Sequence, residues 1–224
     1  MIPKFNAIIL SIAMTFVFLN SAFSQDEDAK SDNYINKRYA FFNFRGTNAI
    51  DVVVGSLMVE GDTPKSDFDL YFRIGYKHHL TSHLNINFTF NKYDVVIKED
   101  YNEGFMSFDL NLEYLFSPHT KFTPFIYAGA GYNASNYFKS TAYKSQGGLG
   151  FEFILTEGVA LKLLGEYNYM LTDDIDGVIE GDTDDVLFRM GLGLNVYFGG
   201  NKKKEALRRK MKTVINSNLI IPYN

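Results

Sequence analysis

The stretch from Asp185 to Phe198 constrains most strongly what this chain can fold into. Every second position in it is apolar: Val186, Phe188, Met190, Leu192, Leu194, Val196 and Phe198. The positions between them are mostly charged, amide-bearing or glycine, as at Arg189, Gly191 and Asn195. A period of two indicates a β-strand with one apolar and one polar face. Such a strand fits a half-buried sheet of a soluble sandwich or the wall of a membrane barrel, and the rest of the chain must decide between them.

Seven further segments alternate in the same way. They cover residues 49–59, 67–77, 84–91, 106–114, 122–134, 146–155 and 159–169. The clearest is 67–77, where Phe72 and Ile74 alternate with Arg73 and Gly75. In the glycine-rich segment 122–134 the sequence does not decide which side chains point inward and which point outward. The segments have about the 9 to 11 residues that a transmembrane β-strand needs.

The connections between these segments alternate in length. Those over 78–83, 117–121 and 156–158 are short, and those over 60–66, 94–103, 135–142 and 172–184 are mostly longer, polar and rich in Asp, Gly and Asn. Short turns at one end and longer loops at the other are typical of a transmembrane barrel with its termini and short turns in the periplasm.

Eight antiparallel strands also form soluble lipocalin-like barrels, so the placement of bulky side chains decides between the two. The apolar face carries Phe72, Phe88 and Phe151, too bulky for an eight-stranded interior, whereas the polar face carries small residues such as Gly75 and Gly148. Closure leaves no strand edge for lipid to meet. The sequence therefore predicts an all-β fold, an eight-stranded antiparallel transmembrane β-barrel over 49–198 with a short C-terminal periplasmic tail.

Both ends of the chain are predicted to lie outside this barrel. Residues 1–24 are typical of a secretory signal peptide, because Lys4 precedes an apolar run over 7–18 and a small-residue cleavage site lies before Gln25. That run is short of the roughly 18 to 20 apolar residues of a retained transmembrane helix. Residues 25–48 are expected to be a leader, mobile over 25–36 and packed at the barrel rim over 39–46. Residues 199–224 form a basic tail, expected as a short helix on anionic headgroups, a strand added to a periplasmic partner, or a disordered segment.

Charged side chains share the polar, inward face of the predicted strands. They are Asp69, Arg73, Lys77, Asp109, Glu113, Glu152, Lys162, Glu166 and Arg189. A gated ion path would use such groups, but in a barrel this narrow an interior salt-bridge network that satisfies buried charges is the favoured interpretation. A continuous water channel is not expected.

The last long connection is strongly acidic. Its carboxylates are Asp173, Asp174, Asp176, Glu180, Asp182, Asp184 and Asp185. Their spacing misses the EF-hand pattern for calcium, so a solvated extracellular loop, bridged by divalent ions to lipopolysaccharide, is the preferred interpretation.

The histidines argue against metal and catalytic sites. His78, His79, His83 and His119 all lie in the short turns, and the chain has no cysteine. Ordered carboxylate spacing for a metal is absent too, so no metal and no cofactor are predicted. Barrel enzymes of this size that modify lipid A place a His or Ser system toward the outer leaflet, where this chain has no histidine, so no enzyme is predicted. The formal net charge of −4 argues against nucleic acid as a partner.

The chain resembles OmpA-type outer-membrane barrels in its eight amphipathic strands and in its last strand. That strand closes with Gly193, Val196 and Phe198, a pattern that resembles the terminal-strand signal recognised by the barrel-assembly machinery. More narrowly, five segments resemble the barrel domain of some curli-secretion channel (CsgG-type) proteins: 41–50, 101–113, 122–132, 174–177 and 213–218. The family's acylated cysteine and pore-forming domain are not found here, so the resemblance implies an accessory to an amyloid secretion channel and not the channel itself.

These observations predict an exported outer-membrane barrel with a structural or accessory role, and the resemblance implies an association with a curli-type secretion channel. Its expected partners are outer-membrane lipid and lipopolysaccharide, the barrel-assembly machinery and, through the resemblance, that channel. Two alternatives stay open: a surface adhesin or ligand-binding barrel acting through its extracellular loops, and a narrow solute pore.

Overall fold

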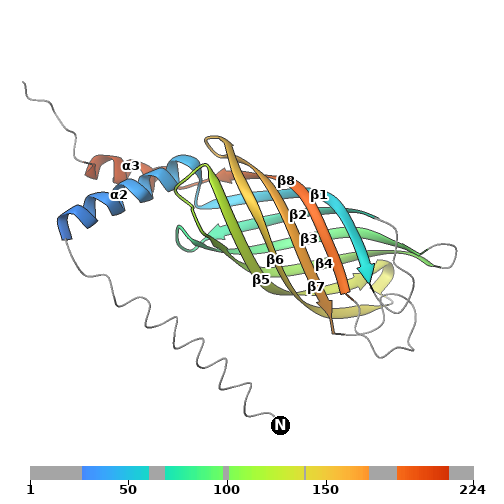
Figure 1. Cartoon of the computed structure of the whole chain (residues 1–224). Coiled ribbons are helices and arrows are strands. Elements are labelled where there is room, and N and C mark those ends of the chain that lie inside the picture. Colours follow the sequence, from blue (N-terminus) through green and yellow to red (C-terminus); the bar gives the residue numbers. More distant parts are fainter. Residues whose placement is uncertain (1–26, 61–68, 98–100, 139, 172–185, 212–224) are drawn as a thin grey trace, which may run out of the picture.

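The computed structural model describes residues 27–60, 69–97, 101–138, 140–171 and 186–211, which form a closed barrel with a helix at each end of the chain (Figure 1). The strands are β1 (Asn48–Glu60), β2 (Asp69–His79), β3 (Leu84–Ile97), β4 (Tyr101–Leu115), β5 (Phe122–Ser135), β6 (Thr141–Thr156), β7 (Val159–Met170) and β8 (Val186–Phe198). Each pairs antiparallel with its neighbour in sequence, and β1 closes on β8 from Asn48 opposite Phe198 to Glu60 opposite Val186. The predicted eight-stranded antiparallel barrel is confirmed.

The apolar and polar residues that alternate in the sequence point alternately to the outer and the inner face of the barrel. Along β2, residues from Tyr71 to His79 are in turn buried and exposed, with Arg73 1% exposed and Leu70 78% exposed. The outer face is apolar on every strand, with Phe88, Leu110 and Leu192 each about half exposed. Water would penalise an apolar surface of this extent, whereas hydrocarbon would not.

Two strands are longer than predicted, so the predicted long loop over 94–103 is wrong. β3 continues to Ile97 and β4 begins at Tyr101, with those two residues paired. The polar residues in this stretch break the alternation, but backbone pairing across a hairpin does not require it. Within the described residues, 94–97 and 101–104 pair only with each other, because β2 pairs no further than Tyr93 and β5 no further than Phe105. The hairpin therefore projects beyond its neighbours (Figure 1).

The N-terminal segment is more ordered than expected. From Glu27 it forms helix α2 (Glu27–Phe44), a regular structure that the sequence did not predict there. At the other end of the chain, Gly199 and Gly200 adopt positive φ angles and turn the chain from β8 directly into α3 (Asn201–Lys210). The two helices lie against each other at the barrel end that holds the short turns (Figure 1). In the described part of the chain, no helix is both long enough and apolar enough to cross a membrane.

Candidate functional site

The lumen contains two ion-pair clusters, and the first of them lies toward the barrel end that carries the helices. Lys77 Nζ lies 2.8 Å from Glu113 Oε1, and Lys162 Nζ lies 2.6 Å from Asp51 Oδ2. Each lysine also approaches the other's carboxylate, at 3.9 Å for Lys77 to Asp51 and 3.8 Å for Lys162 to Glu113. The four charges therefore alternate in sign, which compensates the cost of burying each of them.

The second cluster, farther from the helices, is built around Glu166. Its carboxylate accepts from Arg73 Nη2 at 2.5 Å and from Arg189 Nη1 at 3.1 Å. Beside it, Lys144 Nζ lies 3.0 Å from Asp109 Oδ2, which is also 3.7 Å from Arg189 Nη1. All five side chains are at most 1% exposed. One carboxylate thus serves two guanidinium groups in the middle of the barrel.

Arg45 closes the helical end of the lumen. It lies between α2 and β1, is 2% exposed, and places Nη2 2.6 Å from Glu152 Oε1. The same guanidinium donates to the Pro118 carbonyl oxygen at 2.6 Å and to Thr123 Oγ1 at 2.9 Å. Burial opposes the charge, but attraction to Glu152 and to Tyr197 outweighs it and raises the pKa of Arg45 above its ordinary value. Arg45 therefore acts as a charged plug that ties α2 to the barrel.

Buried aromatic side chains also fill the lumen, and several of them lie above a glycine of a neighbouring strand. Tyr127 and Phe125 on β5 lie opposite Gly148 and Gly150 on β6. A Cβ on Gly148 would lie 2.4 Å from a ring carbon of Tyr127, closer than atoms can approach. The glycines of the polar face thus make room for rings, and the interior is packed.

The residues predicted for the interior network lie in these clusters, apart from two. Glu152 pairs with Arg45 instead, and Asp69 begins β2 and is half-buried. The sequence reasoning missed Arg45, Asp51 and Lys144. Asp51 lies on the polar face of the first predicted strand and could have been found by its alternation. Lys144 lies before the predicted start of its strand, and Arg45 lies outside the predicted barrel.

Other predicted sites have different outcomes. The acidic connection, Asp173 to Asp185, lies outside the described residues. Gly193 faces the lumen, whereas Val196 and Phe198 are exposed on the outer face, 47% and 45% respectively. Among the described residues, no group of three or more His, Cys, Asp or Glu side chains could hold a metal ion. His83 and His119 do meet, with ring centroids 5.5 Å apart.

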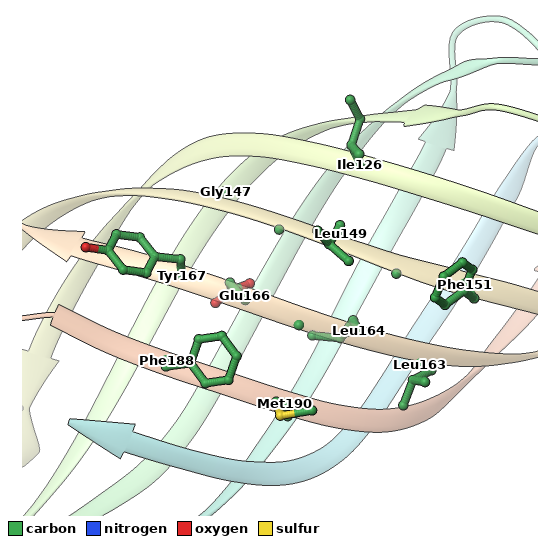
Figure 2. Close-up of a pocket in the computed structure, with 13 residues that line it drawn as sticks. Ile126, Gly147, Leu149, Phe151, Leu163, Leu164, Glu166, Tyr167, Phe188 and Met190 are labelled. Atoms are coloured by element: carbon green, nitrogen blue, oxygen red, sulfur yellow. The ribbon is translucent and has the colours of Figure 1, made fainter. Parts of the chain in front are cut away.

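An apolar hollow of about 490 Å³ opens on the outer face of β6 to β8. Figure 2 shows Leu149, Tyr167, Phe188 and Met190 around it. The hollow exists because Gly165 carries no side chain on the outer face, where a Cβ would meet nothing within 4 Å. Its lining surface is almost wholly apolar, so it suits a hydrocarbon chain or an apolar protein surface.

This architecture is similar to that of known outer-membrane proteins. A family model described as the outer membrane protein beta-barrel domain matches residues 12–198. The solved structure of Neisserial surface protein A is 14% identical, with a TM-score of 0.58 over 68% of this chain and 98% of that one. Ail, the attachment invasion locus protein of Yersinia pestis, is 13% identical, with a TM-score of 0.50 over 69% of this chain and 100% of that one. At these identities the likeness shows the fold alone, and comparison with curated proteins finds no match.

Proposed function

This chain belongs to the outer membrane protein β-barrel family, and on that premise we propose that it is a structural or accessory barrel that acts through its surfaces and not through its lumen. We propose further that it is exported by its N-terminal signal peptide, that both termini lie in the periplasm, and that it catalyses no reaction. The packed lumen is the observation that carries this proposal. Two ion-pair clusters, the aromatic rings and the Arg45 plug fill the space that a solute or a substrate would need.

Conductance in planar lipid bilayers tests the proposal. The purified full-length chain, folded in detergent and shown to be folded by a heat-dependent shift on a gel, should give no stepwise conductance. A known porin added to the same bilayer serves as the positive control. Stepwise openings by this chain in the absence of the porin would favour the narrow-pore alternative and overturn the proposal.

The partner that we propose for the accessory role is a curli-type amyloid secretion channel. Support comes from the sequence resemblance alone, since neither the family match nor the similar structures name such a channel. Deleting residues 202–224 provides the test, because an accessory that binds through its basic tail should lose co-purification with the channel. Unchanged co-purification would place the contact elsewhere, and no co-purification of the intact chain would remove this partner.

An adhesin is the second candidate function, and the projecting β3–β4 hairpin favours it. The hairpin extends past the strands beside it at the end away from the helices, and a projecting strand pair offers backbone groups to a ligand (Figure 1). Replacing residues 95–102 with an Asn-Gly turn should leave the barrel folded. If the adhesin hypothesis holds, cells that display the variant should no longer bind to host surfaces. The tail deletion is the matched control, since it should leave such binding intact.

A further inference from the structure

A cationic trough lies between α2 and the two neighbouring turns at the helical end of the barrel. Its cavity volume is about 520 Å³, and it is lined by Lys37 and Arg38 of α2, by His83 of the β2–β3 turn and by His119 of the β4–β5 turn. Among the described residues, none with a carboxylate side chain lines it. Within the described residues, neither Lys37 nor Arg38 forms an ion pair, and Arg38 donates a hydrogen bond to Tyr34. The trough therefore carries positive charge that the described part of the protein does not neutralise.

Hydroxyl groups and a second helix extend this trough. Ser82, Ser117 and Thr120 also line it. A smaller cavity next to it shares Arg38 and Ser82 and reaches Lys203 of α3. Figure 1 shows why both helices contribute, because α2 and α3 lie together at this end. Ammonium, guanidinium and hydroxyl donors around one hollow are the groups that bind phosphate in proteins.

His119 contributes hydrogen bonding more than charge. Burial lowers the pKa of His119, and the neighbouring His83 lowers it further. Among the described residues that line the trough, Lys37 and Arg38 are the lysine and arginine, which makes them the residues to alter.

The edge of the trough indicates which phosphate compound it takes. Phe116 lines the trough and is 51% exposed, and its ring meets that of Tyr114 on the apolar outer face, 5.4 Å between centroids. Leu80, 54% exposed, borders the smaller cavity. The hollow thus joins the lipid-facing surface on one side and the cationic helices on the other, the arrangement of a membrane interface. A free phosphate ion has no apolar part that could contact the exposed side chains of Phe116 and Leu80.

We propose that this trough binds the headgroup of an anionic phospholipid, with phosphate between Lys37 and Arg38 and the acyl chains over Phe116 and Leu80. The proposal depends on the orientation proposed above, in which this end meets the periplasmic leaflet. It goes beyond the proposed function, because it gives the helices a defined ligand that holds them against the membrane.

Native mass spectrometry of the full-length chain in detergent tests the proposal, with phosphatidylglycerol and phosphatidylcholine of equal chain length as probes. The wild type should retain phosphatidylglycerol in preference to phosphatidylcholine. The double variant Lys37→Gln/Arg38→Gln should bind phosphatidylglycerol roughly 30-fold more weakly, since each basic group near a membrane surface contributes about a factor of five. The matched control Arg208→Gln/Arg209→Gln removes the same charge from the far part of α3 and should bind as the wild type does.

Three results would overturn the proposal: equal retention of the two lipids by the wild type, unchanged retention by the α2 variant, or equal loss in the α3 control. Retention of inorganic phosphate without any preference between the lipids would also reject the lipid assignment. The variant Arg38→Lys keeps the charge and should keep the lipid, which separates loss of binding from loss of folding. Bilayer conductance, measured separately, would show whether the proposed function fails independently.

Discussion

Replacing Glu166 with glutamine removes the charge that holds two buried guanidinium groups, and the consequence can be estimated. Glu166→Gln preserves the volume of the side chain but leaves Arg73 and Arg189, both about 1% exposed or less, without the carboxylate that lies 2.5 Å and 3.1 Å from them. Removing one partner of a buried ion pair costs about 3–5 kcal/mol, mostly through the charge left uncompensated. Because one carboxylate serves two cations, we expect a loss near 5 kcal/mol in the free energy of unfolding.

The assay is denaturant unfolding of the barrel in lipid vesicles, followed by the mobility of the folded band on unheated gels. The control is Glu157→Gln, which removes an exposed carboxylate 3.5 Å from Lys204. A surface pair of this kind contributes about 0–1 kcal/mol, so the control should barely shift the midpoint. A Glu166→Gln barrel within about 1 kcal/mol of the wild type would refute the reasoning, because the lumen would then be wet enough to solvate both arginines.

The remaining predictions concern the packing of the lumen and its plug. Gly148→Ala should destabilise the barrel by about 1–3 kcal/mol because its Cβ would overlap Tyr127, whereas Gly165→Ala, which points into open space, should be nearly neutral, and denaturant unfolding in vesicles compares the two. Equal effects would contradict the assigned faces. Arg45→Met should cost about 3–5 kcal/mol by leaving Glu152 unpaired, and Arg45→Met/Glu152→Gln should recover part of that loss. A double-mutant cycle with no coupling would show that the plug contributes nothing through its charge.

The strand pattern could be predicted from the sequence where the two faces contrast chemically. In β2 the inward residues Arg73, Gly75 and Lys77 differ in kind from the outward Phe72, Ile74 and Tyr76, so the sequence shows which face each side chain points to. In β5 the small residues over 128–131 provide no such contrast. Its facing is set instead by Gly148 and Gly150 of β6, which leave room for two inward rings. That information lies in another strand and becomes usable only once the register is known.

The barrel end closed by α2 could not be predicted for a related reason. Helix α2 has almost no amphipathic pattern, so periodicity could not reveal it. Arg45 meets Glu152 across 107 residues of sequence, and nothing local marks it as part of the lumen. Asp51 is the contrary case, since it lies in register with the inward face of β1 and pairs with Lys162.

The central claim is that the lumen is packed, and the absence of native cysteine allows a direct test of it. Thr89 lies on the lumen face near the middle of β3 and is fully buried, whereas Thr81 lies exposed in the β2–β3 turn. Single variants Thr89→Cys and Thr81→Cys, each folded into lipid vesicles, are treated with a charged water-soluble thiol reagent. A packed lumen predicts rapid labelling at position 81 and none at position 89 unless the barrel is unfolded. Rapid labelling at position 89 in the folded barrel would contradict the account.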